Sequence, residues 1–305
     1  MNSFKLTALG SLAAMPSSNK NQSAHILNVY EQIFLLDAAE GVQKQLKRYD
    51  FNSLKINNIF ITHIHGDHFY GIYGLISTMS LMGRKHKLTI FGPSPISSII
   101  SNHCALFEPH LSYPIECREV DTAKQQLVFE NKVLEVFSLP LRHKIPTVGY
   151  FFKEKPPRRN IHKHIIERYN LEYVDVNALK DGRDVVLEDS TILESRKATY
   201  QPYAPRSFAY ITDTAPSKEV AAAIRGVDLL FHEATFLERD KRLAMATMHS
   251  TTKDAAYIAT QSEAKKLLIG HFSLRYKSGD KEYLSEINRH FTASEIAIEG
   301  KTYDI

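Results

Sequence analysis

Hydrophobic and polar positions along this chain follow the patterns of strands and helices in turn. Apolar runs of strand length occur at residues 4–9, 24–29, 32–36, 59–61, 88–93, 133–139, 147–153, 207–214, 227–231 and 266–271. Helix-like spacing of apolar residues lies between several of these runs, at residues 38–46, 69–82, 217–225 and 252–263. Strands that alternate with helices are typical of layered α/β proteins. We therefore predict an α/β fold with a single core.

The pattern changes between residues 153 and 200. Basic residues stand at the front of this polar stretch, among them Arg158, Arg159 and Lys163, and acidic residues follow from Asp175 onward. We interpret residues 153–200 as an insertion within one domain that spans residues 1–305. A solvated excursion with no partner would have the same composition, so charge alone assigns the insertion no function.

Composition excludes some classes of protein. The 305 residues are 43% hydrophobic and 24% charged, as in soluble globular proteins. No apolar run reaches the roughly 18 residues that span a bilayer, so we expect no membrane partner. Residues 6–15 are apolar and follow Lys5, but they lack a clustered basic start and lead into a polar turn. We expect a first strand and loop there rather than a signal peptide.

Cysteine content and charge add two further expectations. Cys104 and Cys117 are the only cysteines, too few for a disulfide framework, and both suit a reducing cytoplasm. We therefore expect a cytoplasmic protein. The formal net charge of +4 permits a polyanionic partner without requiring one, because nucleic-acid binding depends on where the Lys and Arg residues lie.

One turn carries a dense set of metal-binding side chains. His63, His65, Asp67 and His68 fall within six positions, directly after the apolar run at residues 59–61. Imidazole and carboxylate ligands without cysteine suit a catalytic zinc site. His63 and His65 would point the same way if the strand continues to them, whereas Asp67 and His68, after the turn, would point toward a second position. This divergence favours two metal ions about 3.5–4 Å apart. The alternative is a polar turn whose histidines cap a helix.

Other polar side chains stand where apolar runs end. These are His143, Asp213, His232 with Glu233, and His271. The carboxyl ends of strands in layered sheets border the crevice where ligands bind, so we expect Asp213, His143 and His271 to join the turn. Asp37 ends another run; we expect it to contact a histidine ligand from behind, with a surface helix cap as the alternative. We interpret His103 and His110 as ordinary surface or core residues.

The turn is the hallmark of the metallo-β-lactamase superfamily, and strings spread over nearly the whole chain resemble ribonuclease Z, the endonuclease that removes 3′ trailers from precursor tRNA. The strings are Leu9-Gly10-Ser11, Asp37-Ala38-Ala39-Glu40-Gly41-Val42-Gln43, Thr62 to Gly71, His143 ahead of Gly149-Tyr150, Ile211-Thr212-Asp213-Thr214, His232-Glu233-Ala234-Thr235-Phe236, His249-Ser250-Thr251-Thr252, and Gly270-His271-Phe272-Ser273-Leu274-Arg275-Tyr276.

The resemblance implies a four-layer αββα metallo-β-lactamase sandwich with an inserted exosite arm at residues 153–200. It implies two Zn²⁺ per subunit, one held by His63, His65 and His143, the other by Asp67, His68 and His271, with Asp213 bridging. It also implies that Asp67 orients or deprotonates the attacking water and that Glu233 and His249 assist departure of the leaving group. His232 has no metal position left to fill, so we expect a structural role for it.

The resemblance further implies cleavage that leaves a 3′-hydroxyl on the tRNA and a 5′-phosphate on the trailer. It suggests a homodimer in which the arm of one subunit serves the site of the other. We also expect the N-terminus of the helix after His249 to cradle a phosphate.

The inserted stretch departs from the family pattern. Bacterial relatives carry a Gly- and Pro-rich motif that grips the tRNA elbow, whereas residues 169–184 here contain Gly182 as their only glycine and no proline. We therefore expect precursor tRNA to be held differently, through phosphate contacts of Arg158, Arg159 and Lys163.

Two other functions compete with this hypothesis. The first is a hydrolase of another substrate class on the same scaffold, such as an arylsulfatase, a cyclic-nucleotide phosphodiesterase or a lactonase. The second is a non-catalytic nucleic-acid-binding module. The basic-fronted insertion and the string His249-Ser250-Thr251 favour RNA over the first, and the complete set of seven candidate ligands argues against the second.

Overall fold

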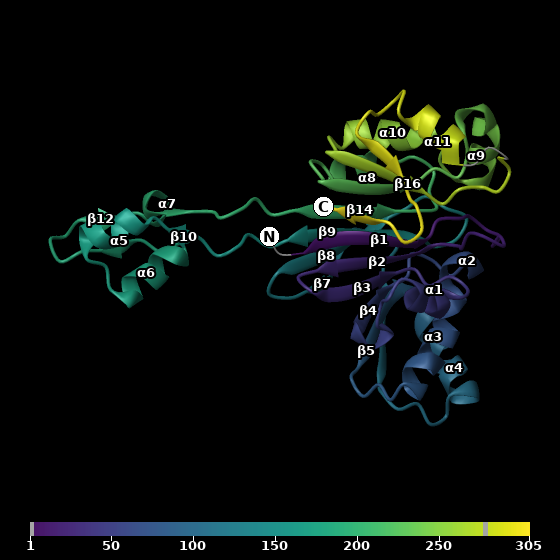
Figure 1. Ribbon diagram of the computed structural model, residues 1–305, viewed down its shortest axis with the longest axis horizontal. Coiled ribbons are helices and arrows are strands. Elements are labelled where there is room, and N and C mark those ends of the chain that lie inside the picture. The colour runs from purple at the N-terminus through teal and green to yellow at the C-terminus, as the bar shows by residue number, and fades with distance from the viewer. Residues whose placement is uncertain (1–2, 277–279) are drawn as a thin grey trace. The chain divides into compact units, whose positions relative to one another are not determined.

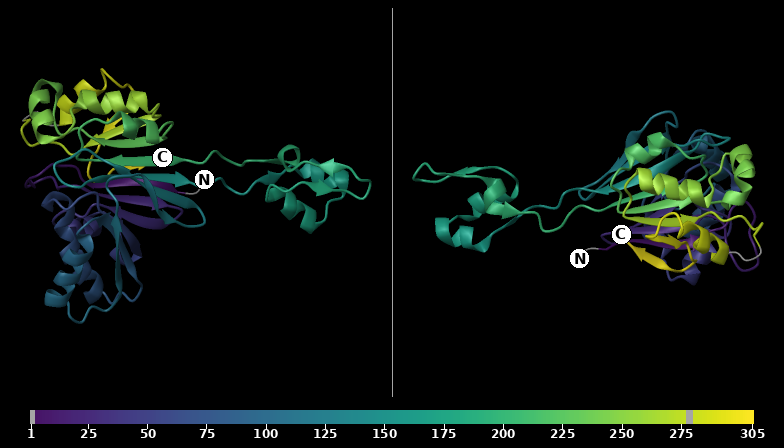
Figure 2. Two further views of the ribbon diagram at one scale, coloured as in Figure 1. Left: turned by 180° about the vertical axis from the view of Figure 1, so that it is seen from behind. Right: turned by 90° about the horizontal axis from the view of Figure 1, so that it is seen from above.

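The computed structural model describes residues 3–276 and 280–305, and within them two large sheets form the core (Figures 1 and 2). The first sheet has seven strands in these residues, in the order β18-β1-β2-β3-β4-β5-β6. Its strands are β1 (Phe4–Gly10), β2 (Ala24–Val29), β3 (Gln32–Leu36), β4 (Ile56–Phe60), β5 (Leu88–Pro93), β6 (Ile115–Val120) and β18 (Thr302–Asp304). From β3 to β6 the strands run parallel, and β1 pairs antiparallel with β2 and β18.

The second sheet also has seven strands within the described residues, in the order β17-β16-β15-β14-β9-β8-β7. They are β7 (Gln126–Glu130), β8 (Leu134–Pro140), β9 (Val148–Glu154), β14 (Ser207–Ile211), β15 (Leu229–Glu233), β16 (Lys266–Gly270) and β17 (Ser294–Ile296). Strands β14 to β17 are parallel, so their carboxyl ends meet at one edge.

Helices cover the outer face of each sheet (Figure 1). On the first sheet they are α1 (Val42–Arg48), α2 (Gly66–Phe69), α3 (Gly71–Leu81) and α4 (Ile96–Phe107), with the 3₁₀ turn η1 (Ser53–Lys55). On the second they are α8 (Lys218–Ala223), α9 (Lys241–Thr247), α10 (Thr252–Gln261) and α11 (Asp280–Ile287), with η2 (Glu238–Asp240). The predicted four-layer αββα sandwich is confirmed. None of the described helices is long and apolar enough to cross a membrane.

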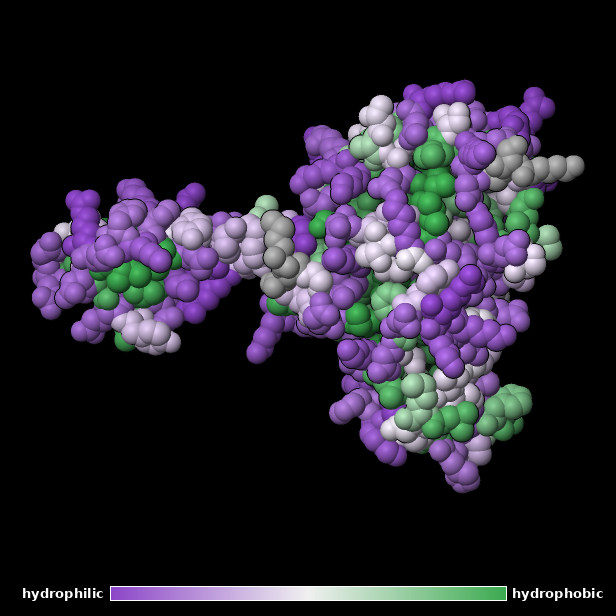
Figure 3. All heavy atoms as spheres, viewed as in Figure 1, coloured by the Kyte–Doolittle hydropathy of each residue, from purple (hydrophilic) through white to green (hydrophobic). Residues whose placement is uncertain are grey.

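Alternation along the strands explains the layers. On β4, Ile59 packs among the helices of its own sheet, while the next residue, Phe60, points toward the second sheet. There the Phe60 ring contacts Phe152 and Tyr150 of β9, with centroids 5.4 and 5.0 Å apart. Side chains on successive residues face opposite sides of a strand, so a single strand contributes residues both to the helix–sheet interface and to the interface between the two sheets. Phe60, Tyr150 and Phe152 are fully buried, and the face shown in Figure 3 is covered mainly by hydrophilic residues.

Most predicted elements are present, but two predicted helices differ from the observed ones, and several observed elements, among them α4, β6, β7 and α11, have no counterpart in the prediction. The helix predicted at 38–46 begins only at Val42, because residues 38 and 39 are irregular and residues 40 and 41 form a turn in which residue 41 has a left-handed backbone. The helix predicted at 69–82 is broken at Tyr70 into α2 and α3. No element was predicted for residues 96–107, where α4 buries only Ile96 and Ile100 and therefore has a weak apolar pattern.

The chain divides into two compact units, and the second consists of Glu130–Glu135 and Lys153–Arg206. Its elements are β10 (Asn160–Ile161), α5 (Lys163–Tyr169), α6 (Tyr173–Lys180), β11 (Val185–Val186), β12 (Ile192–Leu193), α7 (Ser195–Ala198) and β13 (Thr199–Tyr200). It has a small core of its own around Leu179 and Ala198. That the segment 153–200 is an inserted, tRNA-binding arm stays a prediction.

Gly71 fixes the approach of α3 to the loop after β3. Its N–H donates to the carbonyl of Ala38 (2.8 Å), and a Cβ at this position would lie 1.8 Å from the carbonyl oxygen of Ala39. We expect Gly71→Ala to lower the free energy of unfolding by about 1–3 kcal/mol, because the backbone must move apart. Urea denaturation measures the change.

Gly74→Ala is the matched control in the same helix. A Cβ there would meet only the side-chain amide of Gln43, which can rotate away, and alanine is the better helix former by about 1 kcal/mol. Equal stability of the Gly71→Ala and Gly74→Ala proteins would contradict this packing argument.

Candidate metal centre

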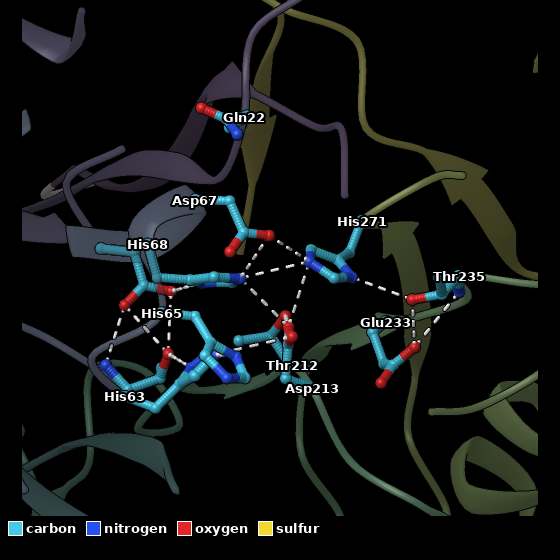
Figure 4. A network of polar contacts seen from close by, with 12 residues as sticks. Gln22, His63, His65, Asp67, His68, Thr212, Asp213, Glu233, Thr235 and His271 are labelled. Carbon is cyan, nitrogen blue, oxygen red and sulfur yellow. Dashed lines mark hydrogen bonds and ion pairs between the residues drawn. The ribbon is translucent and has the colours of Figure 1, made fainter. Parts of the chain in front are cut away.

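Loops at the carboxyl ends of strands from both sheets bring the predicted side chains together (Figure 4). The residues predicted as ligands follow β4, β8, β14 and β16, and they are His63, His65, Asp67, His68, His143, Asp213 and His271. Asp37 after β3, Asp213 after β14 and His271 after β16 have left-handed φ values of 54°, 49° and 61°. Such a backbone costs roughly 1–2 kcal/mol per residue and turns each side chain sharply out of its strand.

A first group contains three histidines and one aspartate. The candidate ligand atoms of His63, His65, His143 and Asp213 all lie within 4.8 Å of one another. His63 Nε2 is 3.0 Å from His65 Nδ1 and 3.6 Å from Asp213 Oδ2, and His143 Nε2 is 3.9 Å from the same oxygen. These distances suit one cation among the four side chains.

A second group lies beside the first and contains Asp67, His68 and His271. The Nε2 atoms of the two histidines are 3.1 Å apart, and each is 3.2 Å from Asp213 Oδ1. Asp67 Oδ2 lies 3.6 and 3.5 Å from them. Asp213 therefore turns one carboxylate oxygen to each group, which is the arrangement of a bridging ligand.

The hydrogen bonds of His68 and His143 at Nδ1 indicate that their Nε2 atoms, which face the two ligand groups, carry lone pairs. His68 Nδ1 donates to Asp37 Oδ2 (2.8 Å), and His143 Nδ1 donates to the carbonyl of Met248 (3.2 Å). A neutral imidazole with its proton on Nδ1 has an acceptor at Nε2. His143 Nε2 is buried and has no hydrogen-bond partner in the described part of the chain. An unpartnered acceptor beside a carboxylate fits a divalent cation, and this set of neutral imidazoles and carboxylates suits zinc.

Burial and charge favour the ligand forms of His63, Asp213 and Asp67, whereas the carboxylates around His68 raise its pKa well above the ordinary value against the effect of burial. Burial lowers the pKa of His63 well below its ordinary value, which favours the neutral ring. Burial alone would raise the pKa of Asp213, but His271, His68 and His63 around it bring that pKa well below the usual range. The pKa of Asp67 is likewise lowered by His68 and His271 against the effect of burial. Both carboxylates are therefore charged at neutral pH.

Glu233 and His249 form a hydrogen-bonded ion pair at the edge of the centre, which is called the acid pair below because His249 is the candidate proton donor. His249 Nδ1 is 2.9 Å from Glu233 Oε1, and the buried carboxylate also accepts from the backbone N–H groups of Thr214 (2.7 Å) and Thr235 (3.2 Å). Burial opposes charge on His249, but the carboxylate raises its pKa to about 9. His249 is therefore an imidazolium at neutral pH. Its side chain is 15% exposed and also lies close to the second group.

A cavity of about 1130 Å³ opens over the two groups. Five of the seven candidate ligands and His249 lie on its wall, together with the exposed residues Met15, Tyr70, Leu274 and Arg275; the five are His65, Asp67, His143, Asp213 and His271. An opening of this size admits a nucleotide and its neighbours.

Within the described residues, His232, Arg158, Arg159 and Lys163 belong to neither ligand group. His232 is buried and its Nδ1 contacts the carbonyl of Glu233, in keeping with a structural role. In the second unit, Arg158 bonds to Asp181 and Asn177, and Arg159 bonds to the hydroxyl and carbonyl of Thr199. The side chain of Lys163 is exposed at the start of α5.

The expected phosphate cradle at α10 is wrong. Thr251 caps the helix, and its hydroxyl accepts from the N–H of Asp254 (3.2 Å). The N–H of Thr252 donates to the carbonyl of Phe236 (3.0 Å). The Asp254 carboxylate accepts in turn from the Thr251 N–H (3.1 Å) and places a negative charge in the first turn. These donors are occupied, and an acid stands where the phosphate would bind.

Sequence reasoning does not identify two buried residues beside the centre, Tyr210 and His25. Asp37 was expected behind a histidine, and it also accepts from Tyr210 Oη (2.9 Å), which nothing in the sequence indicated. His25 was also missed: it is fully buried against Tyr210 and Phe231, and burial lowers its pKa to about 3. An isolated histidine within an apolar strand carries no sequence signal of this kind.

Comparison with known proteins places the chain in a family. The family model described as anti-Pycsar protein Apyc1 matches residues 4–283. A ribonuclease Z of Porphyromonas gingivalis is 39% identical over 277 residues, 91% of each chain. A ribonuclease Z of Cytophaga hutchinsonii is 37% identical over 301 residues, 98% of this chain and 96% of the relative.

Solved structures agree on the fold. The crystal structure of the short form of human tRNase Z covers 99% of both chains with a TM-score of 0.71 and 24% identity. The metallo-β-lactamase-fold protein YhfI of Bacillus subtilis covers all of both chains with a TM-score of 0.69 and 14% identity. The chain belongs to the family that the Apyc1 model describes and to the ribonuclease Z family, whose members are phosphodiester-hydrolysing endoribonucleases with the metallo-β-lactamase fold.

Proposed function

We propose that this protein is a two-zinc endoribonuclease that removes the 3′ trailer from precursor tRNA. The observation that carries the proposal is the meeting, beside one cavity, of two ligand groups that share Asp213 and of the acid pair Glu233–His249. Relatives named ribonuclease Z that match over nearly the whole chain support the choice of substrate.

Each ligand group would hold one cation. His63, His65 and His143 would hold the first, Asp67, His68 and His271 the second, and Asp213 would contact both. When bound, two zinc ions supply a nucleophile from water at neutral pH and neutralise the charge that develops on the phosphate.

The residues around the cations complete the chemistry. Asp67, held by the N–H of Ala14 (2.8 Å), would orient the attacking water and accept its proton. As the bond between phosphorus and the 3′-oxygen of the tRNA breaks, His249 would donate a proton to that oxygen. The products are a 3′-hydroxyl on the tRNA and a 5′-phosphate on the trailer.

The second unit would bind the body of the tRNA. We propose phosphate contacts for Arg158, Arg159 and Lys163, of which Arg158 and Lys163 are exposed. The first two already have partners within the unit and would share them with phosphate. We further propose that the protein acts in the cytoplasm as a homodimer, as the family resemblance suggests.

The test is cleavage of a precursor tRNA that carries a 3′ trailer, beside bis(p-nitrophenyl) phosphate and a cyclic nucleotide. We expect a single cut after the tRNA, with a 3′-hydroxyl and a 5′-phosphate at the new ends. Hydrolysis of a cyclic nucleotide without cleavage of the RNA would instead support the cyclic-nucleotide phosphodiesterase.

Shortening the second unit separates RNA binding from chemistry. Glu154 is buried and pairs with Arg206, whose carbonyl accepts the Glu154 N–H (2.9 Å). We expect a protein with residues 156–204 replaced by two glycines to keep this pairing and to hydrolyse bis(p-nitrophenyl) phosphate normally. Cleavage of precursor tRNA should fall by about 100-fold or more, because phosphate contacts are lost. Loss of both activities in a folded protein would show that the unit shapes the active site itself.

The pH dependence should report His249. Because Glu233 raises its pKa to about 9, the imidazolium persists through neutral pH and is lost only above that value. Cleavage of RNA should therefore fall as the pH rises through about 9, and Glu233→Gln should move this fall to lower pH. A profile measured on precursor tRNA that Glu233→Gln leaves unchanged would exclude His249 as the titrating acid.

A further inference from the structure

We propose that Thr235 is a positioning residue whose single hydroxyl ties a metal ligand, His271, to the carboxylate that holds the leaving-group acid, His249. The inference rests on the proposed metal centre and assigns a residue that the family motif leaves without a role. Thr235 lies just after β15, is 4% exposed, and stands between Glu233 and His271 in Figure 4.

The direction of each hydrogen bond follows from the partners. Thr235 Oγ1 is 2.5 Å from Glu233 Oε2 and 2.8 Å from His271 Nδ1. An ionised carboxylate has no proton to donate, so at this distance the threonine hydrogen must point to Glu233. The hydroxyl oxygen then accepts from His271, whose proton is on Nδ1.

Glu233 is held as a charged acceptor by geometry. Besides the Thr235 hydroxyl, its two oxygens accept from the N–H groups of Thr214 and Thr235 and from His249 Nδ1. Four donors around a fully buried carboxylate leave it no lone pair to spare for an additional proton.

The consequence for His271 is a fixed tautomer. With its proton on Nδ1, the ring turns a bare Nε2 lone pair toward Asp213 Oδ1 (3.2 Å) and His68 Nε2 (3.1 Å). Without the hydroxyl, the ring could carry its proton on Nε2, where it would block a cation. Hydrogen-bond partners of this kind set both the orientation and the basicity of a metal-binding imidazole.

The first ligand group contains the same arrangement. Thr62 Oγ1 lies 3.0 Å from both oxygens of Asp37 and 3.1 Å from His63 Nδ1. Asp37 also accepts from the N–H of Thr62 (2.8 Å) and from His68 Nδ1. In each ligand group, therefore, a threonine hydroxyl lies between a buried carboxylate and one histidine. Thr62 links Asp37 to His63 in the first group. Thr235 links Glu233 to His271 in the second. The two carboxylates differ in their remaining side-chain partners, because Asp37 also accepts from His68 and Tyr210, whereas Glu233 also accepts from His249.

The test compares Thr235→Val, which keeps the shape and removes the hydroxyl, with Thr235→Ser, which keeps the hydroxyl. Zinc affinity is measured by competition with a chromophoric chelator. We expect Thr235→Val to bind zinc about 10- to 100-fold more weakly and Thr235→Ser to bind it nearly as well as the unchanged protein. Thr7→Val is the control for loss of a buried hydroxyl, since the Thr7 hydroxyl pairs with the Thr302 hydroxyl on the paired strand β18.

Thr62→Val separates the two functions of Thr235. It should weaken zinc binding but leave unchanged the ratio of RNA cleavage to bis(p-nitrophenyl) phosphate hydrolysis at saturating zinc. Thr235→Val should also lower that ratio, because Glu233 and His249 lose a support. Equal ratios in the two variants would overturn the link to the acid pair.

A spectrum gives a readout that does not depend on activity. In zinc-loaded protein with ¹⁵N-labelled histidine, His271, assigned by its loss in His271→Asn, should carry its proton on Nδ1. A proton on Nε2 in the unchanged protein would overturn the inference even if Thr235→Val does not fold. Unchanged zinc affinity in folded Thr235→Val would overturn it too. If the unchanged protein binds no zinc at all, the proposed function fails instead.

Discussion

Asp67→Asn should lose catalysis on precursor tRNA and on bis(p-nitrophenyl) phosphate alike, by about 1000-fold or more in kcat. The substitution keeps the size of the side chain, and its amide oxygen can still accept the N–H of Ala14. It removes the charge beside His68 and His271 and the group that would accept the proton of the attacking water. Because this role precedes departure of the leaving group, the loss should not depend on the substrate.

Glu40→Gln provides the matched control for Asp67→Asn. Glu40 is an exposed acid on the wall of the same cavity and belongs to neither ligand group. We expect its variant to retain the activity of the unchanged protein. If single-turnover rates of Asp67→Asn and Glu40→Gln were equal, Asp67 would have no part in the chemistry.

His249→Asn should distinguish the two substrates. Loss of the proton donor should slow cleavage of precursor tRNA by about 10²- to 10⁴-fold, because a ribose alkoxide is a poor leaving group. Bis(p-nitrophenyl) phosphate should be affected far less, since p-nitrophenolate departs without a proton. Glu233→Gln should act in the same direction, because it removes the carboxylate that keeps His249 charged.

Rates at saturating zinc on both substrates measure this effect. Equal losses on the two substrates would mean that His249 supports the metal centre rather than the leaving group. That alternative is open to His249 because it lies close enough to Asp213 and His271 to share a cation with them.

The sequence predicts the strands and the ligand set because both depend on local pattern. The parallel strands are buried on both faces and appear as apolar runs, and their ends carry Asp213 and His271. The chemistry of the turn from His63 to His68 indicates two cations before any fold is known.

What holds the ligands could not be predicted from pattern. The partner of His143 is the backbone carbonyl of Met248, 105 residues away, which has no side-chain signal. Tyr210 lies 173 residues from Asp37 and appears in the sequence as one more apolar strand residue. The cradle expected at α10 failed for the opposite reason, because local capping by Thr251 and Asp254 satisfies those donors.

The most direct test of the two-cation centre is a crystal structure of zinc-loaded protein with anomalous scattering at the zinc edge. We predict two peaks per chain, one about 2.0–2.2 Å from His63, His65 and His143, the other at the same distance from Asp67, His68 and His271, with an oxygen of Asp213 facing each. A single peak, or ligands that point away from one another at saturating zinc, would contradict the account.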